Sequence, residues 1–319
     1  MQYMNNRNKC YSIASVDAAR DDAALLNIET VILADCLPPL THPSRPAAAL
    51  PAGSWDCHCH VFGPADRFPY AEGRSYTPPD APFENLLALH RHLGVARAVI
   101  VQAACHGHDH AVLIDALVRS DSRYRGVALW SDQASADDLQ RLHDAGVRAI
   151  RFNFVPHLGT PPDVDTLMHA ATRIAPLGWH LCVHVDDASL QQWLPTLKRL
   201  PVPFVVDHMG RIQTRDGLDS PGFRSLLALA EVPHAWVKVS GIDRISAGQR
   251  PFSDGVPFVR ALIDALPDRV LWGTDWPHPN VRGDMPDDGE VVDALFLACP
   301  SAENRERLLV HNPRRLYDV

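Results

Sequence analysis

Histidines and a carboxylate occur in two short motifs that lie far apart in the chain. Residues 56–60 read Asp-Cys-His-Cys-His, and residues 273–278 read Gly-Thr-Asp-Trp-Pro-His. Side chains alternate between the two faces of a strand, so His58 and His60 are predicted to point to one face and the two cysteines to the other. Two imidazoles that converge with the carboxylate of Asp275 could hold one metal ion, or could serve as the acid and base of a hydrolytic site.

The composition limits the class of protein. The chain has 319 residues, of which 46% are hydrophobic and 21% charged, and this is enough to build a large core. It contains no apolar run of about 18 residues, and residues 1–52 lack the features of an export signal, so a cytoplasmic protein that does not span a membrane is expected. Seven cysteines without a repeated CxxC spacing are expected to be reduced thiols. The net charge of −8 argues against a nucleic-acid partner, so an anionic ligand is expected to be small and held locally.

From Ser54 onward, short apolar runs rich in β-branched residues alternate with longer amphipathic stretches. The predicted strands are Ser54–Val61, Ala96–Gln102, Gly126–Leu129, Ala149–Phe152, His180–Val185, Val202–Asp207, Ala235–Ser240 and Arg269–Trp272. The predicted helices are Glu84–Leu93, Ala111–Ser120, Ser135–Ala145, Val164–Ala175, Ser189–Leu200, Pro221–Ala230 and Phe252–Leu266. This alternation predicts an α/β protein with a single-domain (β/α)8 TIM barrel. A doubly wound open sheet would alternate in the same way, but it normally carries a glycine-rich nucleotide-binding turn, and neither GxGxxG nor GxxxxGK[ST] occurs.

The first 52 residues do not follow this alternation. Residues 1–52 have mixed polarity and become rich in proline and alanine toward their end. We therefore expect an extended N-terminal arm that is partly disordered and then lies on the domain. Residues 53–319 are expected to form the barrel, and the sequence leaves the oligomeric state open.

Most residues with suggestive chemistry follow predicted strands, at the end where barrel enzymes keep their sites. They are His58 and His60 after the first strand, Gln102, Cys105 and His106 after the second, Arg151 and Asn153 after the fourth, His184 after the fifth, His208 and Arg211 after the sixth, Ser240 and Arg244 after the seventh, and Asp275 and His278 after the eighth. A single residue such as His184 could equally be a core histidine. The number of such residues at the carboxyl ends of the predicted strands nevertheless predicts a site there.

On these residues the chain resembles the amidohydrolase superfamily, and within it the family of 2-pyrone-4,6-dicarboxylate lactonase. The wider pattern is a His-x-His pair after the first strand, single histidines after the fifth and sixth, and an aspartate after the eighth. The narrower resemblance is carried by DCHCHVFGP (56–64), FPY (68–70), YTPPDAP (76–82), VIVQAACHGHD (99–109), IRFNF (150–154), GWH (178–180), DHMGR (207–211), WGTDWPHPN (272–280) and NPRRLY (312–317). This narrower resemblance extends from about residue 43 to the C-terminus. The combination of DHMGR and WGTDWPHPN is specific for this family.

This resemblance implies a carboxylic ester hydrolase that opens the lactone ring of a small polycarboxylate in aromatic-compound catabolism. By the same resemblance, His58, His60 and His208 polarise the lactone carbonyl, and Asp275 takes a proton from the attacking water. These residue types suit the reaction, because a carbonyl oxygen must be stabilised as it becomes an oxyanion and water needs a base.

The resemblance also implies a pocket for carboxylates, to which guanidinium groups are suited. The implied contacts are Tyr76, Arg151, Arg211 and Arg244. Two positions depart from the family pattern, since Ala104 stands where a serine is expected and His157 where an arginine is expected. The expected partner is therefore a small substrate with two or more carboxylates, and the departures leave its identity open.

The end of the fifth predicted strand departs as well, because His184 stands where this family carries a tyrosine. Metal-dependent members of the superfamily have a histidine ligand there. The resemblance therefore leaves two versions open. In one, His58, His60, His184 and Asp275 hold one Zn²⁺ or Mn²⁺, and His208 acts from outside the metal sphere. In the other, no metal is bound and His184 contacts the substrate.

Two other functions also stay open on the sequence. A metal-dependent decarboxylase, or another lactonase of the superfamily, would use the same residues with His184 as a ligand. A non-catalytic barrel that binds an anion is the third reading, and Asp275 argues against it, because a carboxylate at the centre of an anion site only repels the ligand.

Overall fold

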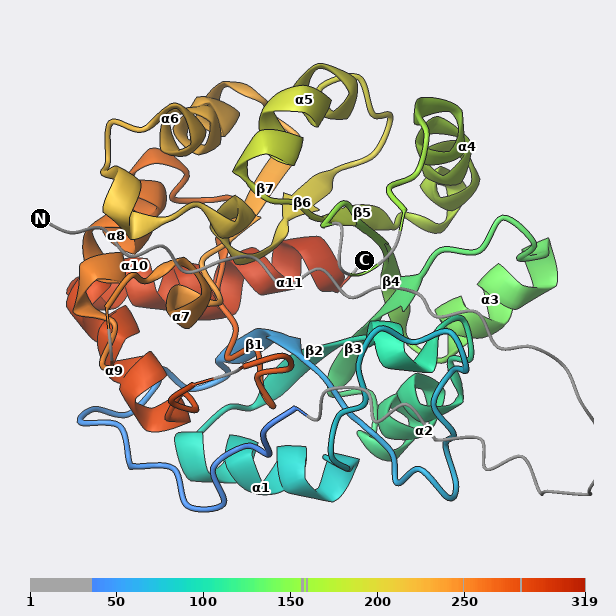
Figure 1. Ribbon diagram of the computed structural model, residues 1–319, viewed down its shortest axis with the longest axis horizontal. Coiled ribbons are helices and arrows are strands. Elements are labelled where there is room, and N and C mark those ends of the chain that lie inside the picture. Colours follow the sequence, from blue (N-terminus) through green and yellow to red (C-terminus); the bar gives the residue numbers. More distant parts are fainter. Residues whose placement is uncertain (1–35, 156–157, 159, 249, 282, 319) are drawn as a thin grey trace, which may run out of the picture. The chain divides into compact units, whose positions relative to one another are not determined.

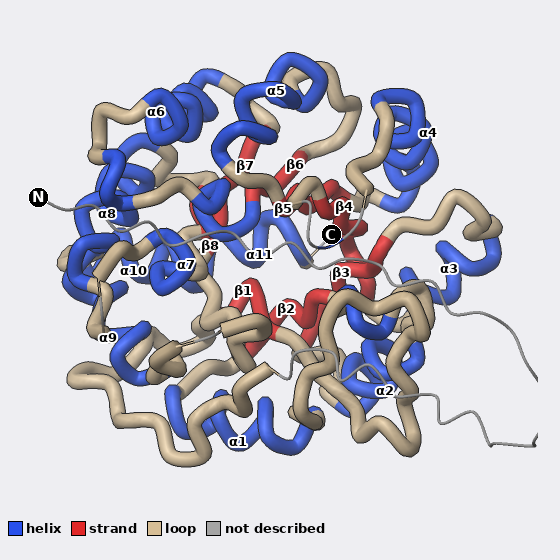
Figure 2. Tube along the Cα trace, viewed as in Figure 1, coloured by secondary structure: helices blue, strands red, loops and turns tan. Residues whose placement is uncertain are grey.

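The computed structural model describes residues 36–155, 158, 160–248, 250–281 and 283–318. Eight parallel strands form one sheet in the order of the sequence (Figure 1). The strands are β1 Trp55–Cys59, β2 Arg97–Val101, β3 Tyr124–Leu129, β4 Val147–Asn153, β5 His180–His184, β6 Phe204–Val206, β7 Ala235–Lys238 and β8 Val270–Leu271. Figure 2 shows them as an inner ring with helices around it. The predicted (β/α)8 barrel is therefore confirmed.

Helices follow the strands on the outside of this ring. The α-helices are α1 Phe83–Leu93, α2 Ala111–Arg119, α3 Ala136–Asp144, α4 Val164–Ile174, α5 Asp187–Leu197, α6 Pro221–Leu227, α7 Ile242–Ile245, α8 Val256–Ala265, α9 Asp288–Ala298, α10 Ala302–Glu306 and α11 Asn312–Tyr317. The 3₁₀ segments are η1 Ala104–His106, η3 Ala175–Leu177, η4 Asp207–Arg211, η5 Thr214–Asp216, η6 Ala228–Glu231 and η7 Ser253–Gly255, and η8 Arg307–His311 is a π-helical segment. Each predicted helix corresponds to one of these within a few residues. The sequence pattern does not predict α9, because buried residues occupy most of its circumference and leave no amphipathic period.

The barrel closes between β1 and the segment that begins with β8. Three backbone hydrogen bonds of 2.8 Å join them, from Cys57 to Trp272, from Asp275 to His58 and from His60 to Trp276. The buried Asp56 carboxylate adds two more, from the Thr274 amide at 3.1 Å and the Thr274 hydroxyl at 2.6 Å. A Cβ atom on Gly273 would lie 2.5 Å from the His58 amide nitrogen, so only glycine allows this approach.

Strand β1 does not keep a simple alternation. Its register against β2 shifts between Asp56 and Cys59. Cys57 packs in the cluster inside the barrel, whereas Cys59 packs in the cluster between the sheet and the helices. The prediction that the two cysteines share a face is therefore wrong, because Cys57 stays on the inner face with Trp55 while the irregularity turns Cys59 toward the helices. His58 and His60 nevertheless converge, with ring centres 5.1 Å apart.

The amino-terminal end of the barrel is filled by large side chains. Trp55 and Trp236 lie inside the strands there, and Leu316 and Tyr317 of α11 pack against them. The rings of Trp55 and Tyr317 stack at 6.2 Å. A site for a small molecule is therefore left to the carboxyl ends of the strands.

The N-terminal arm is described from residue 36, and its first 35 residues lie outside the described part. Residues 36–52 have no helix or strand and lie along the barrel domain. The Ser44 amide donates to Asp287 at 2.9 Å, and the Ala47 amide donates to Asp293 at 2.7 Å. This part of the arm therefore lies on the domain.

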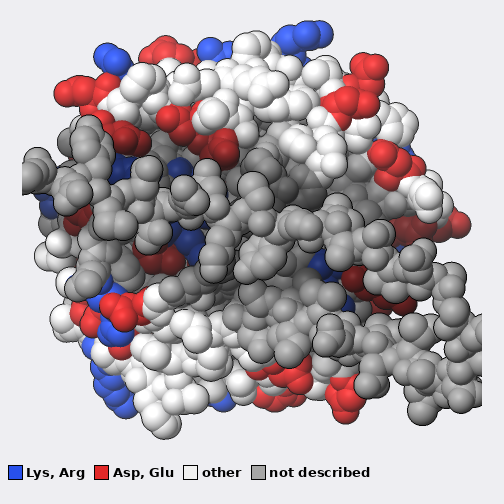
Figure 3. Space-filling view, viewed as in Figure 1, with Lys and Arg blue, Asp and Glu red and all other residues white. Residues whose placement is uncertain are grey.

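Within the described residues, no helix is both long enough and apolar enough to cross a membrane. On the face seen in Figure 3, the acidic and basic side chains of the described residues are interspersed.

Candidate active site

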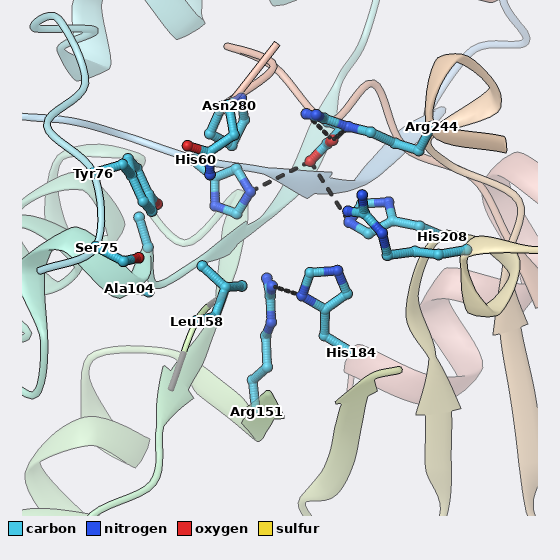
Figure 4. A pocket seen from close by; sticks show the side chains of 14 residues that line it. His60, Ser75, Tyr76, Ala104, Arg151, Leu158, His184, His208, Arg244 and Asn280 are labelled. Carbon is cyan, nitrogen blue, oxygen red and sulfur yellow. Dashed lines mark hydrogen bonds and ion pairs between the residues drawn. The ribbon is translucent and has the colours of Figure 1, made fainter. Parts of the chain in front are cut away.

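A cavity of about 310 Å³ opens at the carboxyl ends of the strands. Its lining includes His60, Tyr76, Arg151, His184, His208, Arg211, Arg244 and Asp275, which come from strand ends and loops spread over the whole chain. Figure 4 shows His60, His184, His208, Arg151 and Arg244 pointing toward one another across it. Most residues that the sequence places after strands are therefore brought together in one place. His157, another predicted contact, lies outside the described residues.

Asp275 stands at the centre of this group. Its Oδ1 lies 3.4 Å from Nε2 of His60 and 3.7 Å from Nε2 of both His58 and His208. This oxygen is buried and accepts no hydrogen bond from the described residues. Asp275 has a left-handed φ of 65°, a conformation that is uncommon outside glycine. The backbone thus holds an unsatisfied carboxylate oxygen against three imidazoles, as functional sites often do.

The other carboxylate oxygen is fully occupied. Oδ2 of Asp275 accepts from Nε and Nη2 of Arg244 at 3.0 and 2.9 Å. Burial alone would raise the pKa of Asp275, but His208 and the Arg244 guanidinium outweigh it and hold this pKa well below its usual range. The carboxylate is therefore ionised at neutral pH, and only Oδ1 is free to accept a proton.

His60 presents a lone pair to the same space. Its Nδ1 lies 2.8 Å from the carbonyl oxygen of Val101, which can only accept, so Nδ1 must carry a proton. In the neutral ring, Nε2 is then an acceptor that faces Oδ1 of Asp275. Two acceptors side by side suit a single water molecule that donates one hydrogen to each.

His208 reaches the cavity through an unusual turn. Residues His208, Met209 and Gly210 of η4 all have left-handed backbone angles, and they turn the chain back over the end of β6. Nδ1 of His208 lies 3.0 Å from the Ser240 hydroxyl. Burial lowers the pKa of His208 well below its usual value, so the ring is neutral and its Nε2 can face Asp275 as a donor.

The three arginines of the cavity differ in what they contact. Arg244 is committed to Asp275. Arg151 donates from Nη2 to Nδ1 of His184 at 2.8 Å, the contact drawn in Figure 4. The guanidinium of Arg211 makes no hydrogen bond or ion pair with the described residues, and burial together with Arg244 lowers its pKa. Of the three guanidinium groups, that of Arg211 is therefore the one available to bind an anionic ligand.

His184 contacts a guanidinium in this structure. A guanidinium is only a donor, so Nδ1 of His184 accepts from Arg151 and its proton lies on Nε2. Neither nitrogen then has a lone pair free for a metal. At the cavity, the described residues whose ligand atoms lie within 4.8 Å of one another are His58, His208 and Asp275. A metal set with His184 as a ligand is therefore not formed in this structure.

His58, His208 and Asp275 have the spacing of a metal site, but positively charged side chains surround them. Arg151, Arg211 and Arg244 line the cavity, and a fourth cation, Lys238, lies behind His58. Positive charge at this density opposes the entry of a divalent cation. The described residues therefore do not fit the four-ligand centre that the sequence left open.

Asp207 and Lys238 also lie at this site, although no motif in the sequence assigns either of them a role. Both side chains are fully buried, and Nζ of Lys238 lies 3.0 Å from Oδ1 of Asp207. The signal for Lys238 is a charged residue at the end of an otherwise apolar strand, Ala235–Lys238. Lysine is almost never fully buried unless it is paired.

Other predicted residues lie outside the cavity and organise loops. The Gln102 amide donates to the carbonyls of Gly107 and Asp109 at 3.2 and 2.8 Å. His106 accepts from the Gly63 amide at 3.4 Å. His278 pairs with Asp288 at 3.2 Å. Their position after strands reflects loop structure and not substrate contact.

Comparison with known proteins gives consistent findings. The family model described as Amidohydrolase matches residues 55–319. The chain is 47% identical to a 2-pyrone-4,6-dicarboxylate hydrolase of Comamonas testosteroni, over 86% of this chain and 93% of that one. It is 39% identical to a 4-sulfomuconolactone hydrolase of Hydrogenophaga intermedia, over 88% and 94% of the two chains. A solved structure from Pseudomonas putida, described as a 2-pyrone-4,6-dicarboxylic acid hydrolase, superposes with a TM-score of 0.74 at 31% identity, over 84% of this chain and 98% of that one.

Proposed function

The chain belongs to the amidohydrolase family, and from this premise we propose that it hydrolyses the lactone ring of a small cyclic dicarboxylate such as 2-pyrone-4,6-dicarboxylate. Two of its relatives are named as hydrolases, one of 2-pyrone-4,6-dicarboxylate and one of 4-sulfomuconolactone, and we place the reaction of this chain in aromatic-compound catabolism. The observation that carries the proposal is the free Oδ1 of Asp275, placed against three imidazoles at the wall of an arginine-lined cavity.

Asp275 and His60 act on water in this proposal. The water donates one hydrogen to Oδ1 of Asp275 and the other to Nε2 of His60, and its oxygen attacks the lactone carbonyl as Asp275 takes the first proton. His58 and His208 each have Nε2 at 3.7 Å from Oδ1 of Asp275, and from there they stabilise the oxyanion that forms. The ring C–O bond then breaks, and the leaving oxygen takes the proton from Asp275. The product is an open-chain acid with one carboxylate more than the substrate.

Arg211 binds a substrate carboxylate because its guanidinium has no internal partner among the described residues. Tyr76 and Ala104 line another part of the cavity, where the planar ring can pack. Arg151 and Arg244 add positive charge while they hold His184 and Asp275. The site therefore favours a dianionic lactone over a neutral one.

We further propose that the reaction proceeds without a metal. The arginines supply the positive charge, and His184 serves as a hydrogen-bond donor through Nε2, which is buried and has no partner among the described residues. A metal-dependent decarboxylase would use His184 as a ligand, and the contact of His184 with Arg151 favours the lactonase instead.

Purified protein should hydrolyse 2-pyrone-4,6-dicarboxylate, followed by the loss of pyrone absorbance, equally well before and after dialysis against a strong chelator. Asp275→Asn keeps the shape but cannot take the proton, so kcat should fall at least about a hundredfold. Asp284→Asn, an exposed change in the loop that contains the cavity residue Asn280, is the matched control and should retain full activity. Faster turnover of neutral sugar lactones, or activity that depends on added metal, would contradict the proposal.

A further inference from the structure

Beneath the cavity, Lys238 and Asp207 form an ion pair that lies out of reach of the substrate. Lys238 is the last residue of β7, Asp207 is the first of η4, and both side chains are fully buried. Burial disfavours both charges, but each partner stabilises the other, so the pKa of Lys238 is raised and the pKa of Asp207 lies well below its usual range. The ammonium is therefore a permanent charge inside the barrel.

The ammonium also contacts a residue of the reaction site. Nζ of Lys238 lies 3.2 Å from Nδ1 of His58. An ammonium can only donate, so Nδ1 of His58 must accept. Burial and the charge of Lys238 lower the pKa of His58 to about 3, so the ring is neutral and holds a single proton. That proton is left on Nε2, which faces Asp275.

Asp207 would favour the opposite arrangement, with the proton of His58 on Nδ1. Its Oδ1 lies 3.5 Å from Nδ1, which is beyond the usual range of about 2.7–3.2 Å for an N–H···O hydrogen bond. The charge of Asp207 is also shared with Arg151, whose Nε lies 3.6 Å from Oδ2. The closer ammonium therefore decides where the proton of His58 lies.

We propose that Lys238 is a positioning residue that fixes the proton of His58 on Nε2, so that the two histidines of one motif act in opposite senses. His58 donates to the oxyanion of the lactone, and His60, whose proton is held on Nδ1 by the Val101 carbonyl, accepts from the attacking water. The assignment of the two tautomers rests on contacts of this chain alone. The roles given to them rest on the proposed lactone hydrolysis.

The tautomers can be measured in the unaltered protein. With ¹⁵N-labelled histidine, the signals of His58 and His60 are assigned by their loss in His58→Gln and His60→Gln. We expect the protonated nitrogen to be Nε2 in His58 and Nδ1 in His60 at neutral pH. A proton on Nδ1 of His58 would overturn the proposal, whatever substrate the protein turns over, so this result is independent of the proposed function.

Lys238→Met tests the cause. With the ammonium gone, Asp207 is the remaining partner of Nδ1, so the proton should move there and the ¹⁵N pattern of His58 should reverse. Because His58 then presents a lone pair to the oxyanion, kcat should fall about 10²- to 10³-fold, as when one oxyanion donor is lost, while KM changes little. A folded Lys238→Met protein with an unchanged His58 pattern, or with kcat within about threefold of the parent, would overturn the proposal.

Cys182→Ala is the matched control. The Cys182 thiol lies 4.0 Å from Nζ on the side away from the reaction, in the cluster inside the barrel. The change disturbs the packing around Lys238 but keeps its ammonium. The ¹⁵N signals of the His58 ring and kcat should therefore be retained. Equal losses in both variants would mean that Lys238 matters only for packing.

Discussion

Arg211 and Arg244 lie side by side in one cavity, yet their contacts assign them different tasks. Arg211 has no internal partner among the described residues, so Arg211→Met should raise KM for the dicarboxylate at least about tenfold, the effect of losing one charge-assisted contact of roughly 1.5–3 kcal/mol. Arg244 holds Oδ2 of Asp275, so Arg244→Met should instead lower kcat about tenfold or more. Steady-state kinetics of the two variants would separate these effects.

The control at this scale is Arg215→Met, which removes the same charge from an exposed position four residues after Arg211. Its KM and kcat should match those of the parent. Similar rises in KM in all three variants would show that the arginines act through general charge and not through the contacts described.

At the scale of elements, the site depends on how closely β1 and β8 approach. A Cβ atom on Gly273 would lie 2.5 Å from the amide nitrogen and 2.7 Å from Cβ of His58, and both groups are held by the barrel closure. Gly273→Ala should therefore push His58 and Asp275 apart, lowering kcat by more than tenfold and the free energy of unfolding by about 1–3 kcal/mol. Denaturant unfolding and kinetics on one preparation would measure both.

Gly283→Ala is the matched change in the same loop, since a Cβ atom there meets nothing within 4 Å. It should leave stability and kcat unchanged. If Gly273→Ala also left stability and kcat unchanged, the close approach of the two strands would not be needed to hold the site.

Over the whole molecule, the N-terminal arm adds stability without touching the reaction. One carboxylate, Asp287, accepts from the Ser44 amide, the Ser44 hydroxyl and the Gly289 amide, each at 2.9 Å. Asp287→Ala leaves these donors unpaired, so the free energy of unfolding should fall by about 1–3 kcal/mol, while kcat stays within about twofold. Thermal unfolding and kinetics would check this, and a large loss of kcat at unchanged Tm would show that the arm acts on the site.

The sequence by itself determined the barrel and the end of it that carries the site. Strand and helix periods are local properties, and parallel strands bring their carboxyl ends to one rim, so His60, His208 and Asp275 could be grouped without coordinates. The motifs also indicated the family, which the comparisons confirm.

Only the tertiary structure decided what each polar group faces. The contact of His184 with Arg151 and the contact of His58 with Lys238 depend on which atoms meet between neighbouring or facing strands. The outward turn of Cys59 depends on a register shift in β1. Hydrogen-bond roles follow from distances of a few tenths of an ångström. No periodicity in the chain encodes such distances, and for that reason the sequence left the metal question open.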